Sequence, residues 1–171
     1  GKAHNALTLT ILTERLTGVQ EETKTNSLMQ WGIDQEPHAI AAYENATGNF
    51  VVGTGLIDHP EIEMSGASPD GYVGTDGLVE IKCPNTATHI DTLLGKSVPE
   101  KYILQMQWQM ACTARQWCDF VSYDPRMPEN LRLFVKRVNR DDVLILDLED
   151  KVREFLADVH AKTVTLQEMA A

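Results

Sequence analysis

Two short extended runs joined by a tight turn constrain the fold of this chain more than any other feature. Tyr72-Val73 and Leu78 to Ile81 flank the turn sequence Gly74-Thr-Asp-Gly77. Turn residues of this kind between apolar runs are typical of a β-hairpin, so the two runs are expected to pair antiparallel. Cys83-Pro84 ends the second arm, because proline has no N–H to donate to a central ladder.

Helical periodicity precedes the hairpin. Apolar residues at helical spacing, Leu7, Ile11, Leu12 and Leu16, indicate a first helix that ends at Gly18. A polar loop from Gln20 to Asn26 leads to a second helix from about Ser27 to Ala46, with Gly48 as its end. Pro37 lies inside this second segment, so we expect a kink or two shorter helices.

The remaining elements alternate between strands and helices. Further strands are predicted at Phe50 to Ile57, Met64 to Ala67, Trp117 to Tyr123 and Leu131 to Val138. Helices are predicted at His89 to Leu94, at Glu100 to Ala114, and in a final amphipathic segment capped by Asp141 or Asp142. This order predicts an α/β (α+β) fold with a central mixed sheet flanked by helices. The 171 residues favour a single domain, 1–171.

Composition narrows the possible classes of protein. The chain has no apolar run near the roughly 20 residues that span a bilayer, and its three cysteines show no C-x-x-C spacing. We therefore expect a cytoplasmic protein without disulfides and without a membrane partner. The formal net charge of −10 argues against a module that coats nucleic acid. It argues less against an enzyme that admits DNA to one local site, because metal-binding carboxylates are themselves acidic.

The hairpin also carries the residues with the clearest chemistry. Glu80 and Lys82 share one face of the returning strand, and Ile81 points to the other face. Asp70 lies just before the outgoing strand and can approach the face of Glu80 and Lys82. Carboxylate oxygens suit Mg²⁺, which assists phosphodiester hydrolysis, and Lys82 can orient or activate the attacking water or contact the scissile phosphate. Taken singly, a Glu-x-Lys on a strand is usually a surface ion pair, and Pro-Asp-Gly is usually a turn.

The order of these motifs resembles that of a known family. The chain is similar to the PD-(D/E)XK nuclease superfamily and, more closely, to the phage lambda exonuclease or YqaJ-type viral recombinase family. The resemblance covers roughly Ser27 to Met127 and rests on Trp31-Gly32 followed by Glu36, Ser68-Pro-Asp-Gly71, Glu80-Ile-Lys-Cys-Pro84, Tyr102 with Gln105 and Gln107, and Tyr123-Asp-Pro-Arg-Met127. The resemblance implies a restriction-endonuclease-like fold.

The resemblance also implies roles for individual residues. Asp70, Glu80 and the main-chain carbonyl of Ile81 would hold the metal, which would be two Mg²⁺ ions with Mn²⁺ as a substitute. Lys82 would position the attacking water or help to deprotonate it. Glu36 would bind a metal-coordinated water, and Gln105 would form a hydrogen bond near the metal or a substrate phosphate. Read without the resemblance, Glu36 is an exposed helix carboxylate and Gln105 a solvated helix amide.

Other side chains carry weaker signals. Arg126 and Tyr123 lie at a strand end and are candidate DNA contacts. The sequence is equally consistent with Arg126 as an ordinary turn arginine. Three tryptophans are read as core residues rather than base-stacking residues: Trp31, Trp108 and Trp117. No role is assigned to His38, His59 or His89, which lack the spacing of metal ligands. Gln107 and Gln109 cannot both share the helix face of Gln105.

By resemblance, the expected activity is digestion of double-stranded DNA ends from 5′ to 3′, which leaves 3′ overhangs for phage-type homologous recombination. The family forms ring-shaped homotrimers and works with a single-strand annealing protein. Family members carry an N-terminal basic segment that holds DNA phosphates near the reaction centre and that this sequence does not show. Its loss would affect polarity and processivity but not hydrolysis. The alternatives are a PD-(D/E)XK endonuclease, a non-catalytic DNA-binding protein of the same fold and an interaction protein.

Overall fold

The computed structural model describes residues 1–20, 22 and 24–170. It divides into two compact units, Thr25–Leu148 and the combination of Gly1–Lys24 with Glu149–Ala171. The Thr25–Leu148 unit holds both sheets and the candidate site.

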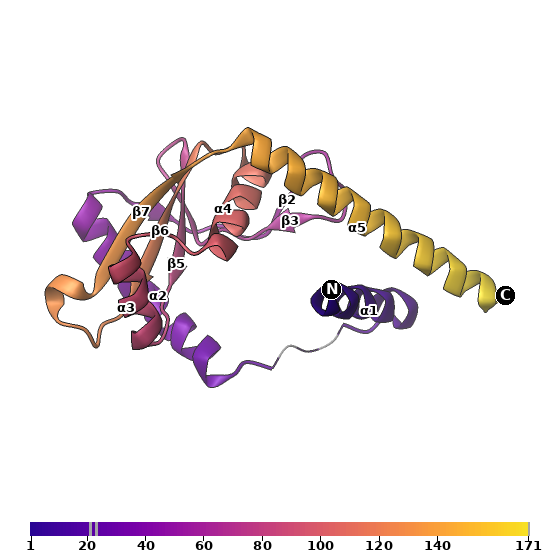
Figure 1. Ribbon diagram of the computed structural model, residues 1–171, viewed down its shortest axis with the longest axis horizontal. Helices are drawn as coiled ribbons and strands as arrows, with labels where there is room; N and C mark the ends of the chain where they lie inside the picture. Colours follow the sequence, from indigo (N-terminus) through magenta and orange to yellow (C-terminus); the bar gives the residue numbers. More distant parts are fainter. Residues whose placement is uncertain (21, 23, 171) are drawn as a thin grey trace. The chain divides into compact units, whose positions relative to one another are not determined.

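The Thr25–Leu148 unit is built on a five-stranded mixed sheet, as predicted (Figure 1). Its strands lie in the order β1 (Val51–Val52), β4 (Gly71–Val73), β5 (Gly77–Lys82), β6 (Trp117–Tyr123) and β7 (Leu133–Asn139). β5 and β6 run parallel, and the other neighbouring strands run antiparallel. The hairpin of β4 and β5 pairs Gly71 with Val79, and Gly74 adopts a φ of 56° in its turn.

The prediction of one continuous strand from Phe50 to Ile57 is wrong. Gly53 and Gly55 lie in an irregular segment that separates β1 from β2 (Ile57–Asp58). β1 joins the main sheet, whereas β2 pairs with β3 (Gly66–Ala67) in a separate two-stranded sheet.

Four helical segments belong wholly to this unit. They are α2 (Ser27–Thr47), α3 (Thr86–Gly95), α4 (Glu100–Thr113) and the 3₁₀ turn η1 (Glu129–Leu131). The side chain of Asn26 caps α2 by accepting a hydrogen bond from the N–H of Met29. α2 passes Pro37 as a single helix, so the expected split does not occur.

The helices cover the two faces of the main sheet. Ala39 and Tyr43 of α2 pack with Ile81 and Val121 in one apolar cluster. Met106 and Met110 of α4 pack with Leu78 and Phe120 in a second cluster. Side chains alternate along a strand, so β5 supplies Ile81 to the first cluster and Leu78 to the second. Glu80 therefore points toward α4, on the same face as Leu78.

The other compact unit is helical. It contains α1 (Lys2–Thr17), which ends as predicted at Gly18 with a φ of 70°, and the part of α5 (Asp142–Met169) from residue 149 onward. Within this unit, the rings of His4 and Phe155 meet edge to face, with their centroids 5.1 Å apart. Asp141 caps α5, because its Oδ1 accepts hydrogen bonds from the N–H groups of residues 143 and 144.

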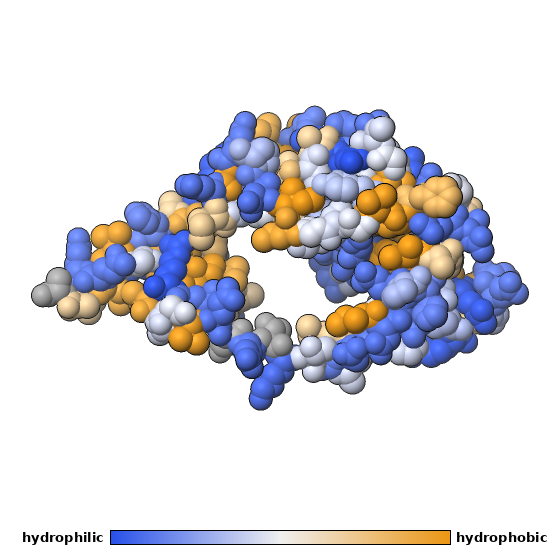
Figure 2. Space-filling model, turned by 180° about the vertical axis from the view of Figure 1, so that it is seen from behind, coloured by the Kyte–Doolittle hydropathy of each residue, from blue (hydrophilic) through white to orange (hydrophobic). Residues whose placement is uncertain are grey.

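The face drawn in Figure 2 carries both hydrophilic and hydrophobic areas. The most exposed large hydrophobic side chains of the Thr25–Leu148 unit are Phe50, Leu56, Met64, Leu94 and Val143. Within residues 1–20, 22 and 24–170, none of the helices combines the length and the hydropathy that crossing a bilayer demands.

Candidate active site

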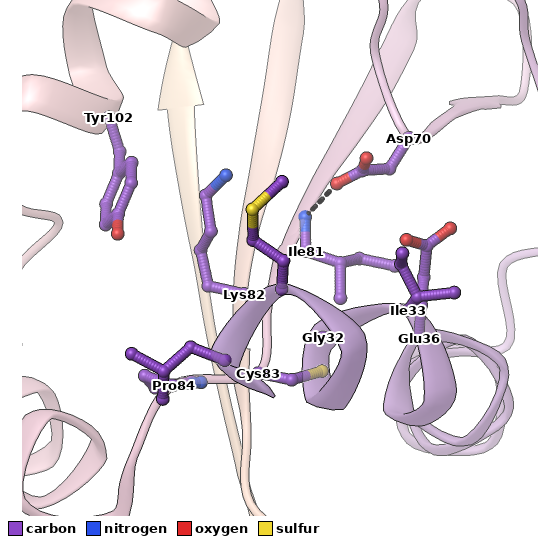
Figure 3. A pocket seen from close by; sticks show the side chains of 11 residues that line it. Gly32, Ile33, Glu36, Asp70, Ile81, Lys82, Cys83, Pro84 and Tyr102 are labelled. Carbon is purple, nitrogen blue, oxygen red and sulfur yellow. Dashed lines mark hydrogen bonds between the residues drawn. The ribbon is translucent and has the colours of Figure 1, made fainter. Parts of the chain in front are cut away.

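A cavity of about 490 Å³ opens beside the end of β5 (Figure 3). It is lined by Leu28, Met29, Gly32, Ile33, Glu36, Asp70, Ile81, Lys82, Cys83, Pro84 and Tyr102. Figure 3 shows Glu36 and Asp70 on one side of the cavity, Tyr102 of α4 on the other, and Lys82 between them. The structure thus brings four of the predicted site residues, Glu36, Asp70, Ile81 and Lys82, to one cavity.

Asp70 is held at the point where the ladder between β4 and β5 ends. The last ladder pair joins Gly71 to Val79, so the N–H of Ile81 lies beyond β4. The side chain of Asp70 replaces the missing strand partner: Oδ2 of Asp70 accepts a hydrogen bond of 2.6 Å from the N–H of Ile81. Gly71 permits this arrangement, because a Cβ there would collide with the side chain of Val51 on the neighbouring strand. The Pro-Asp-Gly sequence therefore turns the carboxylate of Asp70 toward β5.

Glu80 is almost fully buried, with 1% of its surface exposed. Its Oε1 accepts a hydrogen bond of 2.9 Å from the Gln105 amide and lies 2.5 Å from the Lys82 ammonium nitrogen. Its Oε2 accepts a hydrogen bond of 2.7 Å from Gln109. A buried carboxylate needs such donors, because transfer of an isolated charge out of water costs several kcal/mol.

The charges around Asp70 are not balanced in the same way. Burial, followed by the negative charge of Glu80, raises the pKa of Asp70 from 3.8 to about 7. The charge of Glu36 acts in the same direction, while the hydrogen bond from Ile81 and the Lys82 ammonium act against it. Two carboxylates thus share a space that one ammonium does not neutralise, which is an arrangement typical of functional sites.

Lys82 is a cation in this site. Burial disfavours its ammonium, but the charge and hydrogen bond of Glu80 outweigh burial and raise its pKa. Its nitrogen also lies 4.9 Å from the centre of the Tyr102 ring, where the electron-rich face of the ring attracts it. Lys82 can therefore donate hydrogen bonds to a water or a phosphate oxygen but has no free lone pair to accept a proton.

The donor set fits magnesium. Mg²⁺ is usually held by one or two carboxylates together with waters and substrate phosphates, and Asp70 and Glu80 supply two carboxylates. Across the described residues, no three or more His, Cys, Asp or Glu side chains are grouped to hold a metal ion, as a closed zinc site requires. Burial, together with the negative charges of Glu36 and Asp70, raises the pKa of the Cys83 thiol in this cavity to about 12.

The two candidate DNA contacts at the end of β6 have different surroundings. Arg126 forms two hydrogen bonds to the buried carboxylate of Asp124, at 2.8 and 3.2 Å, and lies over the ring of Trp31 at 4.4 Å. Half of its side chain is exposed. Tyr123 is only 8% exposed and packs in the α2 cluster, so its ring is a core residue instead of an open contact surface.

One tryptophan, Trp108, and two histidines, His59 and His89, are held by hydrogen bonds within the fold. Trp108 donates a hydrogen bond to the carbonyl of Gly66 and stacks on His59, whose Nδ1 accepts two backbone N–H groups. Both ring nitrogens of the buried His89 form hydrogen bonds, to Ser122 and to the carbonyl of Leu131.

Gln109 was missed as a partner of Glu80. Gln105 and Gln109 are four residues apart on α4, so both face β5, whereas Gln107 points away. The spacing of four residues is the signal that identifies Gln109, because residues at i and i+4 share a helix face.

A mixed sheet that carries the buried Glu80, the partly buried Asp70 and a lysine at the end of its hairpin is the arrangement that the sequence motifs predict for a nuclease. The chain belongs to the YqaJ-like viral recombinase domain family, whose profile matches residues 2–116.

Solved structures agree with this membership. The chain is 51% identical to an alkaline exonuclease, LHK-Exo, from Laribacter hongkongensis, with a TM-score of 0.93 over 97% of this chain and 84% of that one. A second structure of LHK-Exo, in complex with dAMP, matches equally well. A phage-related exonuclease from Haemophilus somnus 129PT shares the fold at 20% identity, with a TM-score of 0.72 over 97% of this chain and 83% of that one.

No curated protein matches the chain. The family and the similarity to LHK-Exo identify it as a nuclease. Exonucleases of this kind generally use divalent metal ions.

Proposed function

We propose that this chain is a Mg²⁺-dependent exonuclease that digests double-stranded DNA from 5′ ends and leaves 3′ single-stranded overhangs for recombination. The observation that carries the proposal is the pairing of Asp70 with the buried Glu80 beside the Lys82 ammonium, at the edge of a cavity. The similarity to an alkaline exonuclease supports the choice of an exonuclease.

We assign the roles that the family resemblance implies, and the surroundings of the side chains support them. Asp70, Glu80 and the Ile81 carbonyl would hold the metal, which lowers the pKa of bound water and neutralises charge on the reacting phosphate. We assign two ions to the site. Lys82, as an ammonium, orients the attacking water or a phosphate oxygen. Glu36 lies across the cavity from Tyr102 and would bind a metal-coordinated water. Gln105 orients Glu80.

The substrate is the end of a DNA duplex. LHK-Exo has been crystallised with dAMP, and a cavity of about 490 Å³ in this chain is of a size that binds small ligands. This similarity supports release of nucleoside monophosphates. Arg126 is the candidate phosphate contact, because half of its side chain is exposed. Hydrogen bonds to Asp124 and to the carbonyl of Pro84 hold the guanidinium in place. Tyr123 contributes only by packing behind this end of β6.

We further assign the family's ring-shaped homotrimer and a single-strand annealing protein as partners. A light-scattering mass equal to one protomer at working concentration would refute the trimer. Copurification of a coexpressed annealing protein tests the second partner.

The central experiment compares DNA substrates with and without ends. Linear duplex labelled at either end, with or without a 5′ phosphate, and covalently closed plasmid are incubated with Mg²⁺, Mn²⁺, Ca²⁺ or a chelator. We expect Mg²⁺-dependent loss of the 5′ label as mononucleotides and an intact closed plasmid. Cleavage of the closed plasmid would indicate an endonuclease, and binding without cleavage would indicate a non-catalytic DNA-binding protein.

A further inference from the structure

Gln109 is a buried side chain beside the candidate metal ligands. It is 1% exposed, and its amide nitrogen donates a hydrogen bond of 2.7 Å to Oε2 of Glu80. We propose that Gln109 is a positioning residue that fixes the Glu80 carboxylate for metal binding. This inference rests on the proposed function, because it assumes that Glu80 is a metal ligand.

The donors around Glu80 divide unequally between its two oxygens. Oε1 accepts a hydrogen bond from Gln105 and is in contact with the Lys82 ammonium, whereas Oε2 accepts a hydrogen bond from Gln109. A carboxylate oxygen has about two lone-pair positions, so Oε2 retains one and Oε1 has none left. A divalent cation is also repelled by the ammonium beside Oε1. Gln109 thereby holds in place the oxygen that remains available to a metal.

The orientation of the Gln109 amide agrees with this role. Its carbonyl oxygen is buried and has no hydrogen-bond partner within the described part of the chain. The reversed amide would place that oxygen against Oε2, so that two acceptors would face each other. The contact with Glu80 Oε2 therefore determines which way the amide points, although one polar atom is left unsatisfied as a result. A buried polar atom without a partner is uncommon in folded proteins and is more readily explained at a functional site.

Gln107 provides an internal comparison on the same helix. It is 2% exposed, as deeply buried as Gln109, but it faces the other way. Its amide nitrogen donates to the carbonyl of Asn139, and its oxygen accepts from the N–H of Asp141. Both ends of Gln107 thus connect α4 to the backbone before α5, with no contact to Glu80. One helix carries a glutamine that joins two elements and another that orients a carboxylate.

The experiment compares Gln109→Met with the matched control Gln107→Met in the full chain. Mn²⁺ binding to the DNA-free protein is measured by electron paramagnetic resonance, alongside the Mg²⁺ concentration that gives half-maximal activity. Residues that orient metal ligands typically contribute 10–100-fold to metal affinity. We therefore expect Gln109→Met to lower the Mn²⁺ affinity, and to raise the Mg²⁺ concentration for half-maximal activity, by about tenfold each. Gln107→Met is expected to lower the Tm while it leaves Mn²⁺ affinity within about twofold of the parent value. Equal Mn²⁺ affinity in the parent protein and Gln109→Met would overturn the inference.

A double-mutant cycle separates positioning from general damage to the fold. If Gln109 acts through Glu80, Gln109→Met adds less than about twofold to the loss of Mn²⁺ affinity already caused by Glu80→Gln. A full tenfold loss in both backgrounds would show that Gln109 acts by another route and would refute the inference. Should circular dichroism show that Gln109→Met is unfolded, Gln109→Asn replaces it with the same expectations, because its shorter amide cannot reach Glu80 in the same way.

The outcome is distinct from that of the central experiment. A parent protein without metal-dependent nuclease activity would defeat the proposed function. An active parent whose Mn²⁺ affinity is unchanged by Gln109→Met would defeat only the role of Gln109.

Discussion

The two ends of β6 contain nearly the same arginine–aspartate ion pair, but the charged residues around the two pairs differ. Near the amino end, Arg137 binds the buried Asp119 through two hydrogen bonds and lies 3.5 Å from the centre of the Trp117 ring. Just beyond the carboxyl end, Arg126 binds the buried Asp124 and lies over Trp31. Each arginine side chain is 47% exposed, so the two ion pairs match in burial as well as geometry.

The two ends differ in that the carboxyl end also has a nearby carboxylate, Asp70, that is not paired with any of the arginines that the structure describes. At the amino end, Tyr43 completes the hydrogen bonds of Asp119, and burial together with Asp119 raises the pKa of Tyr43 to about 12. Beyond the carboxyl end, burial alone would raise the pKa of Asp124, but hydrogen bonds from Arg126 and Thr86 hold it below its usual value. Asp70 is not paired with an arginine of the described residues, and the hydrogen bond from Ile81 and the charge of Lys82 do not offset the rise in its pKa caused by burial and Glu80. Compensated charge therefore marks structure at both ends, and uncompensated charge marks the candidate site at one.

The largest expected effect separates Glu80 from Asp119. Glu80→Gln removes a candidate metal ligand's charge while it keeps the side-chain volume, so we expect nuclease activity to fall by at least about 10³-fold. Asp119→Asn, the matched change at the other end, is expected to leave kcat per folded molecule within about twofold. Initial rates on linear duplex at saturating Mg²⁺ check both. Comparable losses in the two variants would erase the distinction between the ends.

The second prediction concerns the pH dependence of folding. In the metal-free protein, Asp70 has a pKa of about 7, against 3.8 when unperturbed, so between these values the folded chain keeps a proton that the unfolded chain releases. Raising the pH from about 4 to about 7 therefore destabilises the fold, by at most about 1.4 kcal/mol per pH unit from this group, with no further change above 7.

Asp70→Asn removes this contribution, so its unfolding free energy should decline less over the same pH range. Urea unfolding in a chelator at several pH values measures the two slopes. Parallel curves for the parent and Asp70→Asn would contradict the raised pKa. The same proton must leave before a metal binds, so Mn²⁺ affinity in the parent should increase up to about pH 7.

The third prediction concerns stability at the amino end. Asp119→Asn leaves the Arg137 guanidinium and the Tyr43 hydroxyl without their charged acceptor, and we expect a loss of about 2 kcal/mol in unfolding free energy. Arg137 is half exposed, so water recovers part of the cost. Urea unfolding measures the change, and a Tm equal to that of the parent would show that this ion pair contributes nothing.

The sequence predicts elements well where local chemistry determines them. The hairpin of β4 and β5 follows from its turn, and the bounds of β6, Trp117–Tyr123, are those predicted, because a run of β-forming residues begins and ends there. The segment from Phe50 to Ile57 could not be divided by pattern. Its two halves pair with strands that follow later in the chain, and periodicity holds no information about which strand is the partner.

The contacts of the candidate site likewise include some that local sequence predicts and others that it does not. Alternation along β5 places Glu80 and Lys82 on one face, and their 2.5 Å contact is in line with that placement. The contact between Glu80 and Gln109 joins residues 29 positions apart on different elements. The contact of Arg126 with Trp31 depends on how α2 packs against the sheet. The four-residue spacing places Gln109 on the helix face of Gln105, but the strand that this face meets is decided by tertiary packing, as is the contact of Arg126.

The smallest expected effect tests the two arginines directly. Arg126→Met and Arg137→Met each remove an exposed guanidinium from a buried aspartate, so their losses of stability should be similar. Only Arg126 reaches the cavity wall, where it donates a hydrogen bond to the carbonyl of Pro84. If it also contacts a DNA phosphate, Arg126→Met raises the KM for linear duplex two- to threefold and lowers the slope of log affinity against log salt by about one. Arg137→Met should change neither quantity. Equal KM values and salt slopes in the two variants would mean that Arg126, like Arg137, only secures the end of a strand.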